Sequence, residues 1–160
     1  MERPRDGLSD RLVADVDALP AADAAPEVEP LHVVDRHPLA VLGEVAANPV
    51  DLFAAWNDAL SFEPVVLDVP AGVALDRPFA VVSYVGADSV AVFPRIAVRL
   101  GADAEASLVE VHLSADVQAL VAPVTELAVA PAARFHHAVL QDVGPSVWQV
   151  GSLAADVDRH

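Results

Sequence analysis

Histidine and carboxylate side chains are the plausible metal ligands and proton-transfer groups of this sequence, because its 160 residues include no cysteine. Glu110 and His112 stand two residues apart in a segment whose apolar residues recur at every second position. On a β-strand such a pair leaves the same face, so it could hold a metal ion or pass a proton. The simpler interpretation is that both residues belong to the polar outer face of a sheet. We therefore assign no catalytic, cofactor-binding or metal site, and keep Glu110 and His112 only as weak candidates for a metal.

The remaining histidines indicate no site. His136 and His137 are adjacent, so on a strand they point to opposite faces and cannot bind one metal ion together. His32 and His37 lie in irregular sequence, and His160 is the last residue. The sequence also lacks a glycine-rich phosphate loop, a G-x-S-x-G nucleophile elbow and a histidine-rich metalloprotease helix. We therefore expect a protein that is not an enzyme.

The charge balance limits the possible partners. There are 24 acidic residues, nine arginines and no lysine, and the formal net charge is −15. Nucleic acids and anionic membranes need a basic surface, so neither is expected as a partner. Without cysteine the chain has no disulfides and no thiolate ligands for zinc or an iron–sulfur cluster. Residues 1–30 lack the apolar core of a signal peptide, and no apolar run is long enough to span a bilayer, so a cytoplasmic location is expected.

Residues 1–47 are predicted to form an N-terminal helix followed by a flexible linker. The helix covers residues 9–19 and ends at Pro20, because proline cannot continue it. The linker that follows is rich in alanine, proline and acids and has almost no large apolar side chains. The apolar face of this helix would consist of Leu12, Val13, Val16 and Leu19.

A second helix is predicted between Asn48 and Leu60, at the start of a domain that spans residues 48–160. Asn48 can cap it, Pro49 suits its first position, and Asp51 suits its electropositive first turn. We expect its large side chains to pack against apolar residues and the helix to cover the end of the structure that follows. A cofactor or partner groove is the alternative. These side chains are Leu52, Phe53, Trp56 and Leu60.

From residue 65 onward a strand pattern repeats at a spacing of 29 residues. IAVRLGADAEASLVEVH (96–112) aligns without gaps with TELAVAPAARFHHAVLQ (125–141). The earlier segment VLDVPAGVAL joins them at an offset of about 31, and LAADVDRH begins like a further copy. Units that cannot bury an apolar face alone must stack, so the sequence predicts a mainly β, right-handed parallel β-solenoid of about three coils. An antiparallel sandwich is the alternative. The aligned pairs include Val98 with Leu127, Leu100 with Val129, and His112 with Gln141.

Three motifs in residues 48–160 carry a family resemblance. The second helix has a phenylalanine–asparagine pattern in Phe53 and Asn57. The first corner has the pattern VPxGVxLxxP, formed by Val69, Pro70, Gly72, Val73, Leu75 and Pro78. The repeats carry LGxxAxxxxxE in Leu100, Gly101, Ala104 and Glu110, and a later set in Glu126, Val129, Ala133, Arg134, Leu140 and Gln141. Together these residues resemble the SufB/SufD family of iron–sulfur cluster assembly scaffolds, and in particular the N-terminal part of SufD.

The resemblance implies a non-catalytic scaffold component of the Suf iron–sulfur cluster assembly system. Its implied partners are SufB-like and SufC-like (ATPase) subunits. It implies no cofactor bound by this chain alone, and an iron–sulfur cluster only at the level of the assembled complex. Two alternatives stay open from the residues themselves: a generic β-solenoid interaction module unrelated to Suf, and a small cupin-like metal or sugar enzyme.

The sequence departs from the family pattern in two places. Phe62, Glu63 and Pro64 stand where the family has an Asp-Gly turn before the first strand. The sequence ends at His160 as another coil begins, before the family's implicated cysteine and histidine positions and its SufC-docking helices. This suggests an N-terminal fragment, a split gene product or a truncated paralogue. An open last coil would leave strand edges unpaired, so we expect the chain to associate there with a second copy or another chain.

Overall fold

The computed structural model describes residues 41–158. All of these residues belong to one compact unit. The helix expected at residues 9–19 and the linker up to residue 40 lie outside the described residues, whereas residues 41–47 are described. The described part is mainly β, and its elements are α2 (Leu52–Leu60), β1 (Val65–Val69), β2 (Phe79–Val85), β3 (Val90–Val92), β4 (Arg95–Leu100), β5 (Glu105–Ser114), β6 (Ala119–Val121), β7 (Val124–Val129), β8 (Arg134–Asp142), β9 (Val147–Gln149) and β10 (Ser152–Val157).

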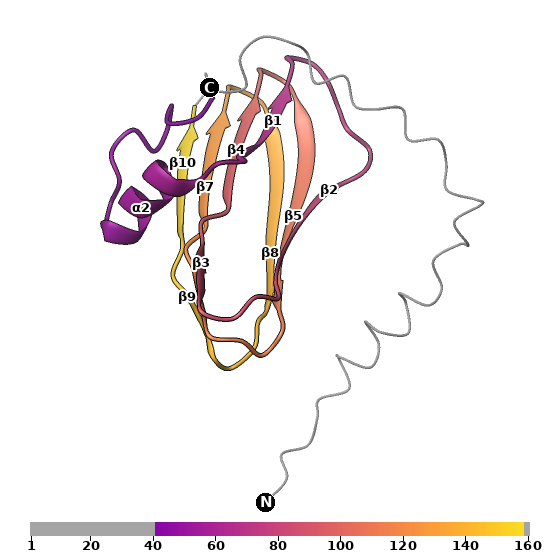
Figure 1. The fold of residues 1–160 in the computed structure, drawn as a ribbon. Coiled ribbons are helices and arrows are strands. Elements are labelled where there is room, and N and C mark those ends of the chain that lie inside the picture. The colour runs from indigo at the N-terminus through magenta and orange to yellow at the C-terminus, as the bar shows by residue number, and fades with distance from the viewer. Residues whose placement is uncertain (1–40, 159–160) are drawn as a thin grey trace, which may run out of the picture. The chain divides into compact units, whose positions relative to one another are not determined.

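The strands form the coils of a parallel β-solenoid. Strands three positions apart along the chain are hydrogen-bonded neighbours, which gives three sheets with the orders β1-β4-β7-β10, β2-β5-β8 and β3-β6-β9. Every strand pairing within residues 41–158 is parallel. Figure 1 shows the successive coils lying side by side. The predicted solenoid of about three coils is confirmed, whereas the antiparallel sandwich and a cupin-like jelly roll, both antiparallel folds, are ruled out.

The register of the coils follows the sequence repeat. In the pairing of β4 with β7, Val98 lies opposite Leu127 and Leu100 opposite Val129, as predicted. In the pairing of β5 with β8, His112 lies opposite Gln141. A slip of one residue would turn every apolar side chain to the other face, so burial fixes this register.

A tight turn recurs at the same corner of each coil. Residues 70–73, 101–104 and 130–133 are each closed by a hydrogen bond from the fourth N–H to the first carbonyl, at 3.1–3.2 Å. These turns stack on one another, because the amide of Gly72 donates to Ala102 and the amide of Asp103 donates to Pro131. The interruption of the strand pattern by proline and glycine is therefore a structural repeat. The third residue of each turn has a positive φ: 73° for Gly72, 59° for Asp103 and 61° for Ala132.

The close stacking of these corners requires glycine at position 101. A Cβ built on Gly101 would lie 2.4 Å from the backbone nitrogen of Ala71 in the preceding coil. No real side chain tolerates that separation, so any larger residue would push the two corners apart. The family-like LG pattern thus has a steric basis.

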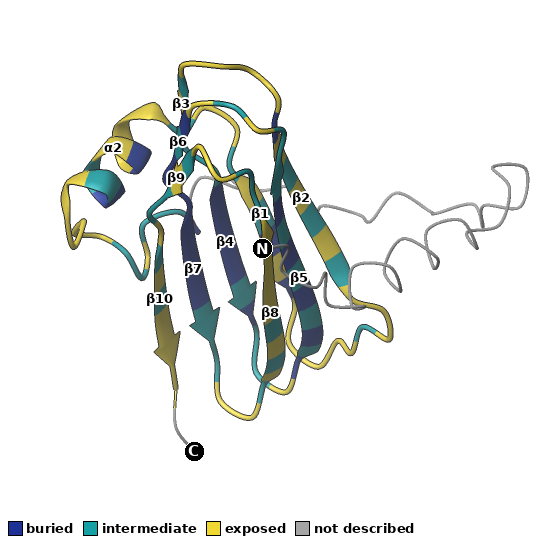
Figure 2. Cartoon of the chain, turned by 90° about the horizontal axis from the view of Figure 1, so that it is seen from below, coloured by how far each residue is buried: buried dark blue, intermediate teal, exposed yellow. Residues whose placement is uncertain are grey.

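Rows of aliphatic side chains from successive coils fill the interior. Within the middle coil, Val98, Leu100 and Leu108 are at most 2% exposed. Figure 2 shows this burial concentrated in β4, β5 and β7, between outer coils that are more exposed. The main rows are Leu67–Val98–Leu127 and Val69–Leu100–Val129.

The helix α2 differs from its prediction in its start, its face and its position. Asp51, rather than Asn48, is the N-cap, and its carboxylate accepts a hydrogen bond from the Ala54 amide at 2.8 Å. The residues buried on α2 are Ala54 and Asn57, whereas Trp56 is 40% and Leu60 is 42% exposed. The helix lies on the flank of the solenoid near β7 and β10, and does not cover the end of the first coil (Figure 1). The helix lies at this position because polar contacts attach it to the solenoid.

Candidate functional site

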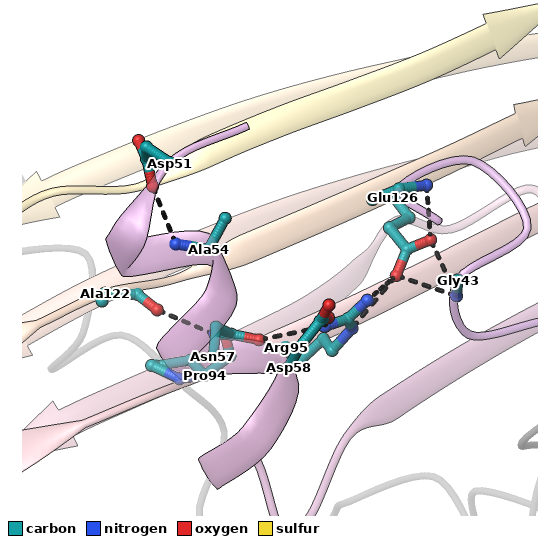
Figure 3. Close-up of polar contacts among 10 residues, drawn as sticks. Gly43, Asp51, Ala54, Asn57, Asp58, Pro94, Arg95, Ala122 and Glu126 are labelled. Carbon is teal, nitrogen blue, oxygen red and sulfur yellow. Dashed lines mark hydrogen bonds and ion pairs between the residues drawn. The ribbon is translucent and has the colours of Figure 1, made fainter. Parts of the chain in front are cut away.

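A buried ion-pair network attaches α2 and the preceding loop to the outer face of the solenoid (Figure 3). Arg95 begins β4 and donates from Nε to Oε1 of Glu126 on β7 at 3.0 Å. A second guanidinium nitrogen of Arg95 pairs with Asp58 of α2. The other oxygen of Glu126 accepts hydrogen bonds from the amides of Gly43 at 2.9 Å and Ala46 at 3.1 Å. One carboxylate thus joins a strand to a loop about 80 residues earlier in the chain.

Two charged groups of this network are buried. Glu126 is 1% and Arg95 is 7% exposed, so each charge depends on its partner. Burial alone would lower the pKa of Arg95, but the hydrogen bonds and negative charges of Asp58 and Glu126 raise it above its ordinary value. The guanidinium of Arg95 therefore stays charged. The role of the network is attachment.

Asn57 extends the same attachment. Its side-chain amide donates to the carbonyl of Pro94 and to the carbonyl of Ala122, both at 2.8 Å. These two carbonyls precede β4 and β7, so one side chain bridges two successive coils. Asn57 is fully buried, which explains why an asparagine, and not an apolar residue, stands in the middle of the packed helix face. Sequence reasoning marked Asn57 only through the family pattern.

The interior holds a second set of polar residues, which we call the interior polar cluster: Glu110 and His112 of β5, Thr125 of β7 and His137 of β8. The expectation that Glu110 and His112 lie on a polar outer face is wrong, because each is only 3% exposed and faces inward with Leu108. The two do share one face, as predicted. His136 is exposed and His137 faces inward, so these neighbours point apart as expected.

Glu110 is the centre of the interior polar cluster. Its Oε1 accepts a hydrogen bond from the Thr125 hydroxyl at 2.6 Å and lies 3.2 Å from Nε2 of His137. Its Oε2 lies 3.6 Å from Nε2 of His112, an ion-pair separation that is too long for a hydrogen bond. Burial raises the pKa of Glu110, but His112, the Thr125 hydrogen bond and the charge of His137 outweigh it and lower the pKa below the usual value. The carboxylate is therefore ionised at neutral pH.

The cluster borders a cavity of about 240 Å³. Glu110, His112 and Thr125 line it together with Gln141 of β8 and Gln149 of β9. Two atoms of this lining, Nδ1 of His112 and Oε1 of Gln149, are buried without a hydrogen-bond partner. Within residues 41–158 no three His, Cys, Asp or Glu side chains are arranged as a metal-binding group.

Sequence reasoning missed most of these partners. Arg95 and Asp58 carry no local signal, because each looks like an ordinary surface charge in the sequence, and Glu126 was marked only as part of the family pattern. The 29-residue repeat could have placed His137 near Glu110. It sets Leu108 opposite His137, and Glu110 follows Leu108 by two residues on the same face of β5. Only the closed coil brings Thr125 and Gln149 to the same cavity.

Comparison with known proteins supports one family. Residues 83–160 match the family model described as SUF system FeS cluster assembly, SufBD core domain. No curated protein and no solved structure matches the chain. The described part of the chain contains no helix that is long and apolar enough to cross a membrane.

Proposed function

The chain belongs to the SufB/SufD family of the SUF iron–sulfur cluster assembly system, and on that premise we propose that it acts there as a non-catalytic scaffold subunit. The family match also sets aside a generic β-solenoid module unrelated to Suf. Within the family we propose a SufD-like role in the cytoplasm, supported by the first-corner motif of Pro70 and Gly72, which lies outside the matched residues. Because the chain has no cysteine, the cluster would be held by the assembled complex and not by this chain alone.

One observation supports an interaction role in particular: the outward face of β2, β5 and β8 is apolar. Val82, Val111 and Leu140 lie in register across the three strands and all point outward. Val82 is 60% and Leu140 is 46% exposed, and Tyr84 beside them is 65% exposed. Contiguous exposed apolar patches mark protein interfaces, so this outer apolar face suits a subunit that binds SufB-like or SufC-like (ATPase) partners. Self-association through the last coil remains a further prediction.

We expect the full chain to capture a SufB-like or SufC-like subunit when the three are co-expressed and this chain is purified by an affinity tag. Val82→Asp should reduce the captured amount at least about tenfold, because it places a charge in the apolar contact. Val50→Asp is the matched control, since Val50 is 79% exposed and lies outside the outer apolar face.

Failure of the unmodified chain to retain either subunit would refute the proposed function. If the two variants instead retained their partners equally well, the scaffold role would stand and the outer apolar face would be the wrong contact surface. Circular dichroism of both variants should match that of the unmodified chain.

A further inference from the structure

The cavity beside the interior polar cluster has the chemistry of a cation site. Nε2 of His112 and Oε2 of Glu110 are 3.6 Å apart, with neither atom hydrogen-bonded to the other. Two ligands at about 2.1 Å from one tetrahedral metal ion stand roughly 3.4 Å apart, so this separation is close to that of a ligand pair. His112 is 3% exposed, and its Nδ1 also has no partner. A buried imidazole nitrogen without a hydrogen-bond partner needs an explanation.

The carboxylate is held as a metal-ligating carboxylate usually is. Thr125 donates a 2.6 Å hydrogen bond to Oε1 of Glu110, which fixes the carboxylate and leaves Oε2 directed at His112. Ligating carboxylates are typically oriented by such a neighbouring donor.

Two glutamines that line the cavity supply neutral oxygen atoms. Oε1 of Gln149 is buried without a hydrogen-bond partner, and the carboxamide of Gln141 lines the same space. A carbonyl oxygen in this position can only accept a hydrogen bond from a donor or coordinate a cation. The volume of about 240 Å³ has room for one ion together with several water molecules.

We propose that this cavity binds a divalent transition-metal ion between His112 Nε2 and Glu110 Oε2, with Gln149 Oε1 as a further oxygen ligand and water at the remaining positions. An imidazole in the set favours zinc, iron or nickel over magnesium or calcium. Only two of the ligands are His or Glu side chains, in keeping with the absence of a three-residue group of that kind among residues 41–158. Such a site exchanges its ion readily. The proposal does not rest on the scaffold function.

The solenoid itself supplies substitutions that should preserve the fold. Glu110 lies between Val81 of the preceding coil and Val139 of the next, so Glu110→Val would extend an existing valine row. His112 lies opposite Gln141, so His112→Gln repeats a residue that this stacked position already accepts. His136→Ala is the matched control, since His136 is exposed on the outward face of β8.

The test is a cobalt titration of the metal-free, untagged full chain, followed by visible absorption and checked by equilibrium dialysis with zinc. We expect one ion per chain, and at least about tenfold weaker binding in both Glu110→Val and His112→Gln, with His136→Ala unchanged. Circular dichroism would establish that each variant is folded. If one variant fails to fold, the other decides.

Three results would overturn the proposal. The first is no cobalt band and no retained zinc in the unmodified chain, and the second is a loss of affinity in His136→Ala equal to that in His112→Gln. The third is unchanged binding in the folded Glu110→Val variant. A cavity that takes an organic ammonium ion instead would give the first of these results.

Discussion

Replacing Glu126 by alanine is expected to destabilise the protein by about 3–5 kcal/mol. The guanidinium of Arg95 is 7% exposed and would lose its buried partner, while Asp58 alone is too exposed to compensate. The amides of Gly43 and Ala46 would lose their acceptor at the same time. Unpaired buried charges cost more than any single packing contact on this surface, so the loop at residues 41–48 and α2 should detach first.

Urea denaturation monitored by tryptophan fluorescence and by circular dichroism would measure this effect. Glu105→Ala is the matched control, because Glu105 pairs with Arg134 on the exposed surface and such pairs contribute about 0–1 kcal/mol. The double variant Arg95→Met with Glu126→Leu should recover much of the lost stability, since it removes both charges together. A single Glu126→Ala variant as stable as Glu105→Ala would show that the network does not hold the helix.

Leu100→Asp is expected to prevent folding, with a loss of about 4 kcal/mol or more. Leu100 is 1% exposed and lies in the interior row between Val69 and Val129. The carboxylate introduced by the substitution would therefore be enclosed by aliphatic side chains. Leu100→Met keeps the volume and should cost less than about 1.5 kcal/mol. Thermal unfolding of the two variants would separate them, and a cooperative transition of Leu100→Asp near that of Leu100→Met would contradict the interior position.

The solenoid could be predicted because its information is repeated in the sequence. The gapless alignment of residues 96–112 with 125–141 is the register of β4 with β7 and of β5 with β8. Stacking requires equivalent positions to face the same way, so three weak strand patterns reinforce one another. The corner was recognisable for the same reason, since proline or glycine recurs in each turn.

The placement of α2 could not be predicted from its apolar pattern. Leu52, Phe53, Trp56 and Leu60 have helical spacing, yet Asn57 is the most buried residue of the helix. Hydrogen bonds from Asn57 to two carbonyls and the ion pair of Asp58 determine which face is turned inward. The spacing of apolar residues in the sequence does not predict polar contacts of this kind.

The orientation of β5 was also misjudged for a definable reason. Alternation predicts that Glu110 and His112 share a face, but it does not say which face is inside. The opposite face carries Val109, Val111 and Leu113, which is the more apolar set, and that set points outward here. Because the outward face of this sheet is itself apolar, the more apolar side of β5 is a poor guide to the interior.

The parallel stacking of coils at a spacing of 29 residues underlies the family assignment, both candidate sites and the outer apolar face. It can be tested by disulfide formation, since the natural chain has no cysteine. Ser107 and His136 lie opposite each other and both face outward, so cysteines at these positions should be about 4.8 Å apart and should oxidise readily. The control pairs Ser107→Cys with Ala138→Cys, which lies two residues further along β8 and should link slowly. Rapid intramolecular oxidation is expected only in the Ser107→Cys/His136→Cys variant; equal or faster oxidation of the control would contradict parallel stacking of the coils at this spacing.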